Sequence, residues 1–135
     1  MNAHPVVIDA SVLVAIFKSE ADSLQLAQRI ASYKRRLLSA ATWLEAAIVC
    51  ESASEQPGGG DDLAEIVTDL NIEVIPFTAE QARVAFNAFR RFGKGRGSKA
   101  SLNFGDCFAY ALAKGLDAPL LFKGNDFTHT DLQPA

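Results

Sequence analysis

The sequence predicts an α/β domain of three layers, with helices on both faces of a mostly parallel sheet of roughly four to five strands. Short apolar runs alternate with longer segments whose apolar residues recur at helical spacing. Such alternation is typical of parallel strands joined by right-handed helical crossovers. A length of 135 residues suits one domain with a substantial core. We therefore expect a single domain over residues 1–135.

The first strand is expected from about Pro5 to Asp9, because the β-branched run Val6-Val7-Ile8 ends there. A helical pattern starts immediately afterwards and extends to about Lys18. Asp9 should therefore lie at the carboxyl end of a central strand, where open α/β sheets bind their ligands. Asp is also a favoured helix N-cap residue, and the sequence alone leaves both interpretations open.

The next elements follow from apolar spacing. A second helix can start at Asp22 and Ser23, and residues 37–39 follow it as a short strand. Thr42 caps or opens a third helix, in which Glu45 lies three residues on, at the spacing of a capping box. Four residues are expected to form the apolar side of the third helix: Leu44, Ala47, Ile48 and Val49.

The second half of the chain continues the alternation. The loop at residues 57–60 precedes a fourth helix, and residues 72–76 form a strand that ends at a proline. A final helix from Asp106 to Lys114 precedes the last strand, at residues 119–122. The helix that directly follows the strand at residues 72–76 opens at Thr78, and its apolar stripe is expected in the core. That stripe consists of Ala82, Ala85, Phe86, Phe89 and Phe92.

Composition argues against several classes of protein. No run approaches the ~20 apolar residues of a membrane span, and no signal peptide is evident, so we expect a cytoplasmic protein. Cys50 and Cys107 have no zinc-type spacing and are expected to be buried without a disulfide. His4 and His129 cannot supply a His-rich metal site, and no context supports a Ser-His-Asp triad.

Basic residues are concentrated in one stretch, although the net charge is −3. No acid occurs between Glu80 and Asp106. A solvated basic loop is the ordinary interpretation of such a run, but beside a site that cleaves phosphodiesters it would hold RNA phosphates. The candidate RNA-binding residues are Arg90, Arg91, Lys94, Arg96 and Lys99.

Four carboxylates fall where a parallel sheet gathers ligands. Asp9 ends the first strand, and Glu45 lies early in the helix after the second. Asp106 begins the helix before the last strand, and Asp126 follows that strand. Each has a structural alternative, since Glu45 can complete a capping box, Asp106 can complement a helix dipole and Asp126 can be a turn residue.

Four acids in one cleft would repel one another. A like-charge pair ~4 Å apart costs about 4 kcal/mol at an effective dielectric constant near 20. A divalent cation would remove that cost, and oxygen ligands without His or Cys select hard ions such as Mg²⁺ or Mn²⁺. The joint pattern therefore predicts a carboxylate–metal site.

The same residues resemble a known family. The segments VIDASVLVA, NFGDCFAYALA and LLFKGNDF, together with the helix around Glu45, look like PIN-domain ribonucleases. They are most similar to the VapC toxins of bacterial toxin–antitoxin pairs, over about Val6 to Leu132. The resemblance implies a Mg²⁺- or Mn²⁺-dependent endoribonuclease that cleaves structured RNA, either transfer RNA or ribosomal RNA. It also implies a homodimer that a VapB-type antitoxin inhibits.

Under this resemblance, Asp9, Glu45, Asp106 and Asp126 are the catalytic acids. Asp9 and Asp106 are expected to bind the metal directly, and Glu45 to orient or deprotonate the attacking water. In-line attack by water predicts a 5′-phosphate and a 3′-hydroxyl. Many relatives have a longer run with a Thr-Asn pair before the last Asp-Phe. The shorter run here leaves open whether Asp126 binds the metal directly or through water.

Two neighbours are expected to support the ligands. Ser11 stands where a small hydroxyl residue is usual, although it can instead bond to the helix backbone. Asn125 precedes Asp126 and can share its role.

Two other classes of function stay open from the residues alone. An aspartyl-phosphate enzyme or receiver domain is also α/β with an acid at a strand end, but no second Asp follows Asp9 at two residues. A non-catalytic RNA- or protein-binding module would use its acids for helix caps and solubility. A metal response without nuclease activity would indicate such a module.

Overall fold

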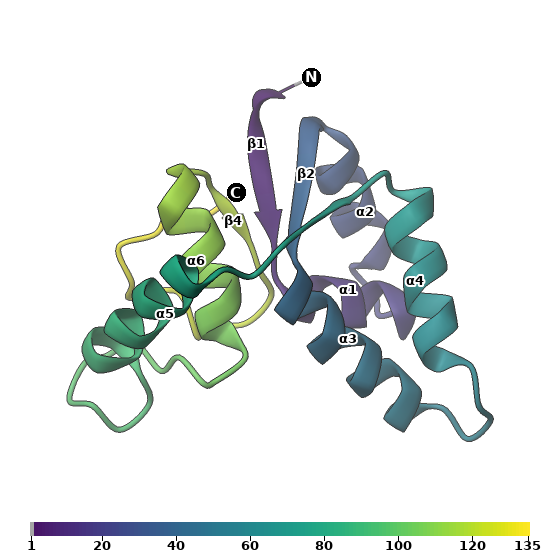
Figure 1. The fold of residues 1–135 in the computed structure, drawn as a ribbon. Helices are drawn as coiled ribbons and strands as arrows, with labels where there is room; N and C mark the ends of the chain where they lie inside the picture. The colour runs from purple at the N-terminus through teal and green to yellow at the C-terminus, as the bar shows by residue number, and fades with distance from the viewer. Residues whose placement is uncertain (1) are drawn as a thin grey trace.

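A computed structural model, which describes residues 2–135, confirms the α/β class (Figure 1). The strands are parallel and form one sheet in the order β3-β2-β1-β4. Their bounds are β1 Asn2–Ile8, β2 Tyr33–Ser39, β3 Glu73–Ile75 and β4 Leu120–Leu121. The helices are α1 Ala10–Phe17, α2 Ser23–Ala31, α3 Ala40–Ala53, α4 Gly59–Asp69, α5 Ala79–Phe92 and α6 Asp106–Leu116.

The helices divide between the two faces of the sheet. In Figure 1, α1 to α4 lie on one side of β1 and β2, and α5 and α6 lie on the other. Each face has its own hydrophobic core, and alternate residues of β1 enter different cores. Val6 and Ile8 pack against the first group of helices, whereas Val7 packs against the second. This burial on both sides explains the continuous apolar run of the strand.

The strand order places a switch point between β1 and β4. The chain passes from β1 to β2 on one side, while β4 pairs with the opposite edge of β1. Ile8 is in register with Leu121, and the Asp9 amide donates to the Leu121 carbonyl at 3.0 Å. Both strands therefore end together, and the segments that follow them open onto the same edge, where such sheets bind ligands.

The start of α3 differs from the prediction. The helix begins at Ala40, directly after β2, and the Ser39 hydroxyl caps it by accepting from the Ala41 amide at 3.3 Å. Thr42 is buried inside the helix, so a capping box from Thr42 to Glu45 is wrong. β2 also begins earlier than predicted, at Tyr33.

Several predicted core residues are on the surface. In α3, the small residues Ala46, Ala47 and Cys50 face the core, because they allow close packing against the neighbouring elements. The prediction was therefore wrong for the larger residues of these helices, which are exposed in part or in full. They are Leu44, Ile48, Val49, Phe86 and Phe89.

Two further predictions concern the cysteines and membrane spans. Cys50 and Cys107 are buried and unpaired, and they belong to the cores on opposite faces of the sheet. No helix within residues 2–135 is both long and apolar enough to cross a bilayer.

Candidate active site

The four predicted acids line one cavity at the carboxyl edge of the sheet. The cavity has a volume of about 260 Å³, and Asp9, Glu45, Asp106 and Asp126 all contribute to its wall. These residues come from the end of β1, from α3, from the start of α6 and from the segment after β4. The fold therefore brings together side chains that are distant in sequence.

Asp9 is both a helix cap and a cavity residue. Its Oδ2 accepts hydrogen bonds from the Ser11 hydroxyl at 2.6 Å and from the Ser11 amide at 3.1 Å. Its Oδ1 is buried and has no hydrogen-bond partner among the described residues. Burial raises the pKa of Asp9 above its ordinary value. A buried carboxylate oxygen without a partner is costly, and a bound cation would remove that cost.

Asp106 begins α6 and is held by Asn103. The Asn103 amide donates to Asp106 Oδ2 at 3.0 Å, and the Asp106 amide donates to Asn103 Oδ1 at 2.9 Å. This reciprocal pair caps the helix and orients the carboxylate at the same time. Burial raises the pKa of Asp106 to about 8, with further contributions from the nearby Asp9 and Asp126.

Glu45 reaches the cavity from the second turn of α3 and is half-buried. Burial, and then the charge of Asp9, raise its pKa to about 7. The Glu45 carboxylate lies directly against Gly105, and a Cβ built at that glycine overlaps its oxygens. The glycine therefore makes the space that Glu45 occupies.

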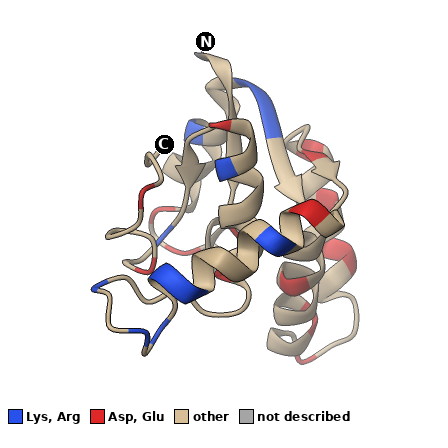
Figure 2. Ribbon diagram, turned by 60° about the vertical axis from the view of Figure 1, so that its left-hand side comes forward, with Lys and Arg blue, Asp and Glu red and all other residues tan. Residues whose placement is uncertain are grey.

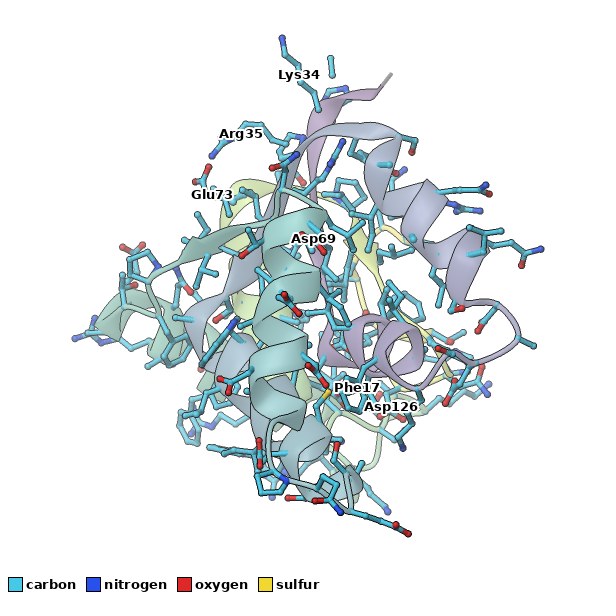
Figure 3. The ribbon with its side chains drawn as sticks, turned by 90° about the vertical axis from the view of Figure 1, so that its right-hand side faces the viewer. Phe17, Lys34, Arg35, Asp69, Glu73 and Asp126 are labelled. Atoms are coloured by element: carbon cyan, nitrogen blue, oxygen red, sulfur yellow. The ribbon has the colours of Figure 1, made fainter. Side chains whose placement is uncertain are left out.

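Asp126 lies in the segment after β4 and is labelled in Figure 3. Its Oδ1 is 3.5 Å from the Ser101 hydroxyl. Ser11 is placed as predicted, because its hydroxyl bonds to Asp9 rather than to the helix backbone. Asn125 is exposed and does not line the cavity, so the geometry gives no support to a role for its side chain.

Three polar residues of the cavity wall were not predicted, namely Glu20, Asn103 and Lys123. Asn103 could have been found from its spacing, because a polar side chain three residues before a helical Asp is a common cap. The fold brings Glu20 and Lys123 together, and no local sequence pattern predicts their contact.

The predicted RNA-binding residues follow α5 into the next loop, and blue segments mark this region in Figure 2. Arg90 lies over the Phe86 ring at 4.9 Å. Arg91 lies over the Phe92 ring at 4.6 Å and is 3.6 Å from Asp131. Lys94, Arg96 and Lys99 are exposed and form no ion pair within residues 2–135.

The donor set of the cavity fits a hard divalent cation. It consists of carboxylate oxygens, one of which is buried and has no hydrogen-bond partner within residues 2–135. The raised pKa values of Asp9, Glu45 and Asp106 reflect burial and the charges of neighbouring acids. In the part of the chain that the structure describes, no three Asp, Glu, His or Cys side chains already have the spacing of metal ligands. Binding would therefore draw these carboxylates inward, which their repulsion opposes until a cation is present.

Gly105→Ala is expected to reduce the activity of this site without unfolding the protein. The added methyl group displaces the Glu45 carboxylate, which is the free end of a flexible side chain. A misplacement of about 1 Å can cost about 10²-fold in rate. The matched control is Gly115→Ala in α6, the helix that Gly105 precedes, where a Cβ meets nothing within 4 Å. Equal activity of the two variants in an RNA cleavage assay would contradict the placement of Glu45.

Comparison with known proteins gives matches in sequence and in fold. Residues 6–132 match the PIN domain. The chain is 43% identical over 129 residues to ribonuclease VapC28 of Mycobacterium tuberculosis, covering 96% of each chain. The Mycobacterium tuberculosis toxin VapC20, which cleaves the sarcin–ricin loop, has the same fold, with a TM-score of 0.77 at 14% identity over 96% of this chain and 98% of that one. VapBC2 from Rickettsia felis, solved with a promoter DNA fragment, gives a TM-score of 0.70 at 15% identity over 97% of both chains.

Proposed function

This chain belongs to the PIN-domain family and, within it, to the VapC ribonucleases of toxin–antitoxin systems, and we propose that it is a divalent-metal-dependent endoribonuclease that cleaves structured RNA. The observation that carries this proposal is the cavity wall shared by Asp9, Glu45, Asp106 and Asp126. Asp9 and Asp106 also cap helices. Gathering four carboxylates in one partly buried cavity nevertheless raises the free energy of the metal-free fold, which a bound cation would offset.

Asp9, Asp106 and Asp126 would hold the cation. Oδ1 of Asp9 has no hydrogen-bond partner within residues 2–135, and Asp106 keeps one oxygen beyond the one that Asn103 holds. A bound Mg²⁺ or Mn²⁺ would supply Lewis-acid chemistry there, by lowering the pKa of a coordinated water and by offsetting charge on the phosphate.

The remaining roles belong to the chain's own side chains. Glu45 has a pKa of about 7, so near neutral pH it can accept a proton from the attacking water. Ser11 and Asn103 hold Asp9 and Asp106 through direct hydrogen bonds and fix their orientation. In-line attack would leave a 5′-phosphate and a 3′-hydroxyl, without use of the ribose 2′-hydroxyl.

Structured RNA, either transfer RNA or ribosomal RNA, is the proposed substrate. One supporting observation is that VapC20, a structural neighbour, cleaves the sarcin–ricin loop. The test is digestion of total RNA by the purified chain with Mn²⁺ and with EDTA, followed by mapping of the cut ends. Discrete cuts with 5′-phosphates in Mn²⁺ alone support the proposal. Mn²⁺ binding without cleavage would indicate a non-catalytic RNA-binding module instead.

The exposed basic residues after α5 are proposed to contact RNA phosphates. Lys94, Arg96 and Lys99 are exposed. Their joint replacement by Ala should therefore reduce the slope of log RNA affinity against log salt concentration by about 2 in magnitude. Binding is measured in an Asp9→Asn background, so that the RNA stays intact. Lys34→Ala, at the start of β2, serves as the control (Figure 3). An unchanged slope in the triple variant would overturn the assignment.

The stability of the metal-free protein should depend on pH. The folded pKa values of Glu45 and Asp106, about 7 and about 8, lie above the ordinary values of 4.5 and 3.8. The folded state therefore binds protons more tightly, and these groups lower its stability as the pH rises through that interval. The melting temperature of the metal-free protein should fall between about pH 5 and pH 8, and Mn²⁺ should restore it.

The same pKa values require that Mn²⁺ binding near neutral pH releases protons. Calorimetric titrations in two buffers with different ionisation enthalpies measure that release. Identical binding enthalpies in both buffers would show that no proton leaves and would contradict the proposed ligands.

A VapB-type antitoxin and a second copy of the chain are the proposed partners. The structural neighbour VapBC2 is such a toxin–antitoxin assembly. Two apolar hollows of about 560 and 410 Å³ share Phe104 and Phe108 as lining residues. Phe104 is 78% exposed, and Leu44 and Ile48 of α3 extend the same apolar face. We assign this face to the homodimer, so Phe104→Asp should yield a monomer in sedimentation equilibrium, and an unchanged dimer would refute the assignment.

A further inference from the structure

The segment between β4 and Asp126 is tied to β1 through its main chain. The Lys123 amide donates to the Ser11 hydroxyl at 3.0 Å, and that hydroxyl donates to Asp9 Oδ2 at 2.6 Å. A hydroxyl has one proton, so the bond that Ser11 accepts from Lys123 fixes the direction in which it donates. The Lys123 backbone thus helps to orient Asp9, together with the Ser11 amide, which donates to the same carboxylate oxygen at 3.1 Å.

The Lys123 side chain anchors the same segment at a second point. Its ammonium group lies between Glu20, with which it forms a short contact, and Asp22, at 2.9 Å. Both acids belong to the connection between α1 and α2, about a hundred positions earlier in the chain. One residue therefore joins the segment that carries Asp126 to the turn that follows α1.

The backbone that follows Lys123 forms a turn that leads to Asp126. Gly124 has a φ of +97°, so the chain turns sharply directly after Lys123. The buried Phe127 holds the far end of the turn, packed against Phe122 with ring centroids 5.2 Å apart. Between these points, Asp126 Oδ1 makes a long contact of 3.5 Å with the Ser101 hydroxyl. The ion pairs of Lys123 fix the near end of the turn.

Lys123 also differs in charge from the rest of the cavity wall. Within the described residues, it is the only base among the residues that line the cavity with the four acids and Glu20. Hydrogen bonds with Glu20 and then with Asp22 raise the pKa of Lys123, so it is charged at neutral pH. A charge effect and a positioning effect of this residue on cation binding therefore have opposite signs.

We propose that Lys123 is a positioning residue for the carboxylate site: its ion pairs with Glu20 and Asp22 hold the segment that orients Asp9 through Ser11 and presents Asp126 to the cavity. This inference rests on the proposed metal-dependent function. The ion pairs themselves are partly exposed, with side-chain exposures of 38–40%. Such pairs contribute little to global stability, so variants of Lys123 should remain folded.

The experiment is a Mn²⁺ titration of the full chain, with free Mn²⁺ measured by electron paramagnetic resonance. Lys123→Met should weaken Mn²⁺ binding by about tenfold, the lower end of what loss of a supporting contact costs. Lys123→Arg, which can keep both ion pairs, should restore most of the affinity. Lys114→Met is the matched control, because Lys114 forms an ion pair of 2.8 Å with Asp131 away from the cavity. The Mn²⁺ affinity of this variant should match that of the unaltered protein.

A double-mutant cycle tests the route of the effect. Ser11→Ala removes the hydroxyl and leaves every charge in place. If Lys123 acts through Ser11, the losses of Mn²⁺ affinity in Lys123→Met and Ser11→Ala should not add in the double variant. Additive losses would overturn the proposed route through Ser11.

The remaining outcomes are equally decisive. Unchanged or tighter Mn²⁺ binding by Lys123→Met would show that Lys123 acts through its charge or not at all, and would overturn the inference alone. Weaker RNA binding with unchanged Mn²⁺ affinity would instead make Lys123 a phosphate contact and would also overturn it. If the unaltered protein binds no Mn²⁺, the proposed metal-dependent function fails together with this inference.

Discussion

Asp9→Asn is expected to lower RNA cleavage by on the order of 10³-fold or more while the protein stays folded. The amide oxygen of Asn can accept both hydrogen bonds that Ser11 donates to Oδ2. The amide nitrogen then occupies the place of Oδ1, which has no protein partner among the described residues. A donor group at that position cannot bind a cation.

The same substitution should raise the melting temperature of the metal-free protein at neutral pH. Asp9 is buried, and burial raises its pKa, so its charged form costs folding free energy above its ordinary pKa. A neutral side chain of the same shape removes that cost. The control is Asp61→Asn, an exposed acid in the first turn of α4, which should change neither cleavage nor the effect of Mn²⁺. Cleavage at the unaltered rate by Asp9→Asn would remove Asp9 from the mechanism.

Asp106→Asn should abolish the stabilisation of the protein by Mn²⁺. A ligand that binds only the folded state at about 100 times its Kd stabilises it by roughly 2.7 kcal/mol, which is several degrees of melting temperature. The Asn side chain can still accept the bond from the Asn103 amide, so the cap of α6 is retained. What is lost is the negative charge at the cation site.

Thermal melts with and without Mn²⁺ measure this effect. The matched control is Asp117→Asn, at the other end of α6, where the residue has a φ of +50° that Asn tolerates. This control should keep the full shift. A full shift in Asp106→Asn would exclude Asp106 as a ligand.

The class of the fold and the location of the site could be predicted from sequence, because both depend on local patterns. The apolar run before Asp9 predicts a buried strand, and a residue at the end of a central strand faces the ligand edge. The position of Asp126 after the last strand predicts the same edge. All four acids do line one cavity there.

Other features depend on contacts that no local pattern contains. Helical periodicity shows which residues share a face but not which face is buried, so Leu44 and Phe86 were predicted inside and are exposed. The start of α3 at Ala40 depends on the end of β2, which also decides that Glu45 lies in the second turn. Each ion pair of Lys123 joins two residues that are far apart in the sequence, with separations of 103 and 101 positions.

In the proposed mechanism, these carboxylates together bind a divalent cation in one cavity. Anomalous diffraction from crystals soaked in Mn²⁺ tests it most directly. We expect a strong anomalous peak in the cavity, with carboxylate oxygens of Asp9 and Asp106 at about 2.0–2.2 Å from the ion. A fully soaked crystal with no peak in the cavity, or with Mn²⁺ bound only elsewhere, would contradict it.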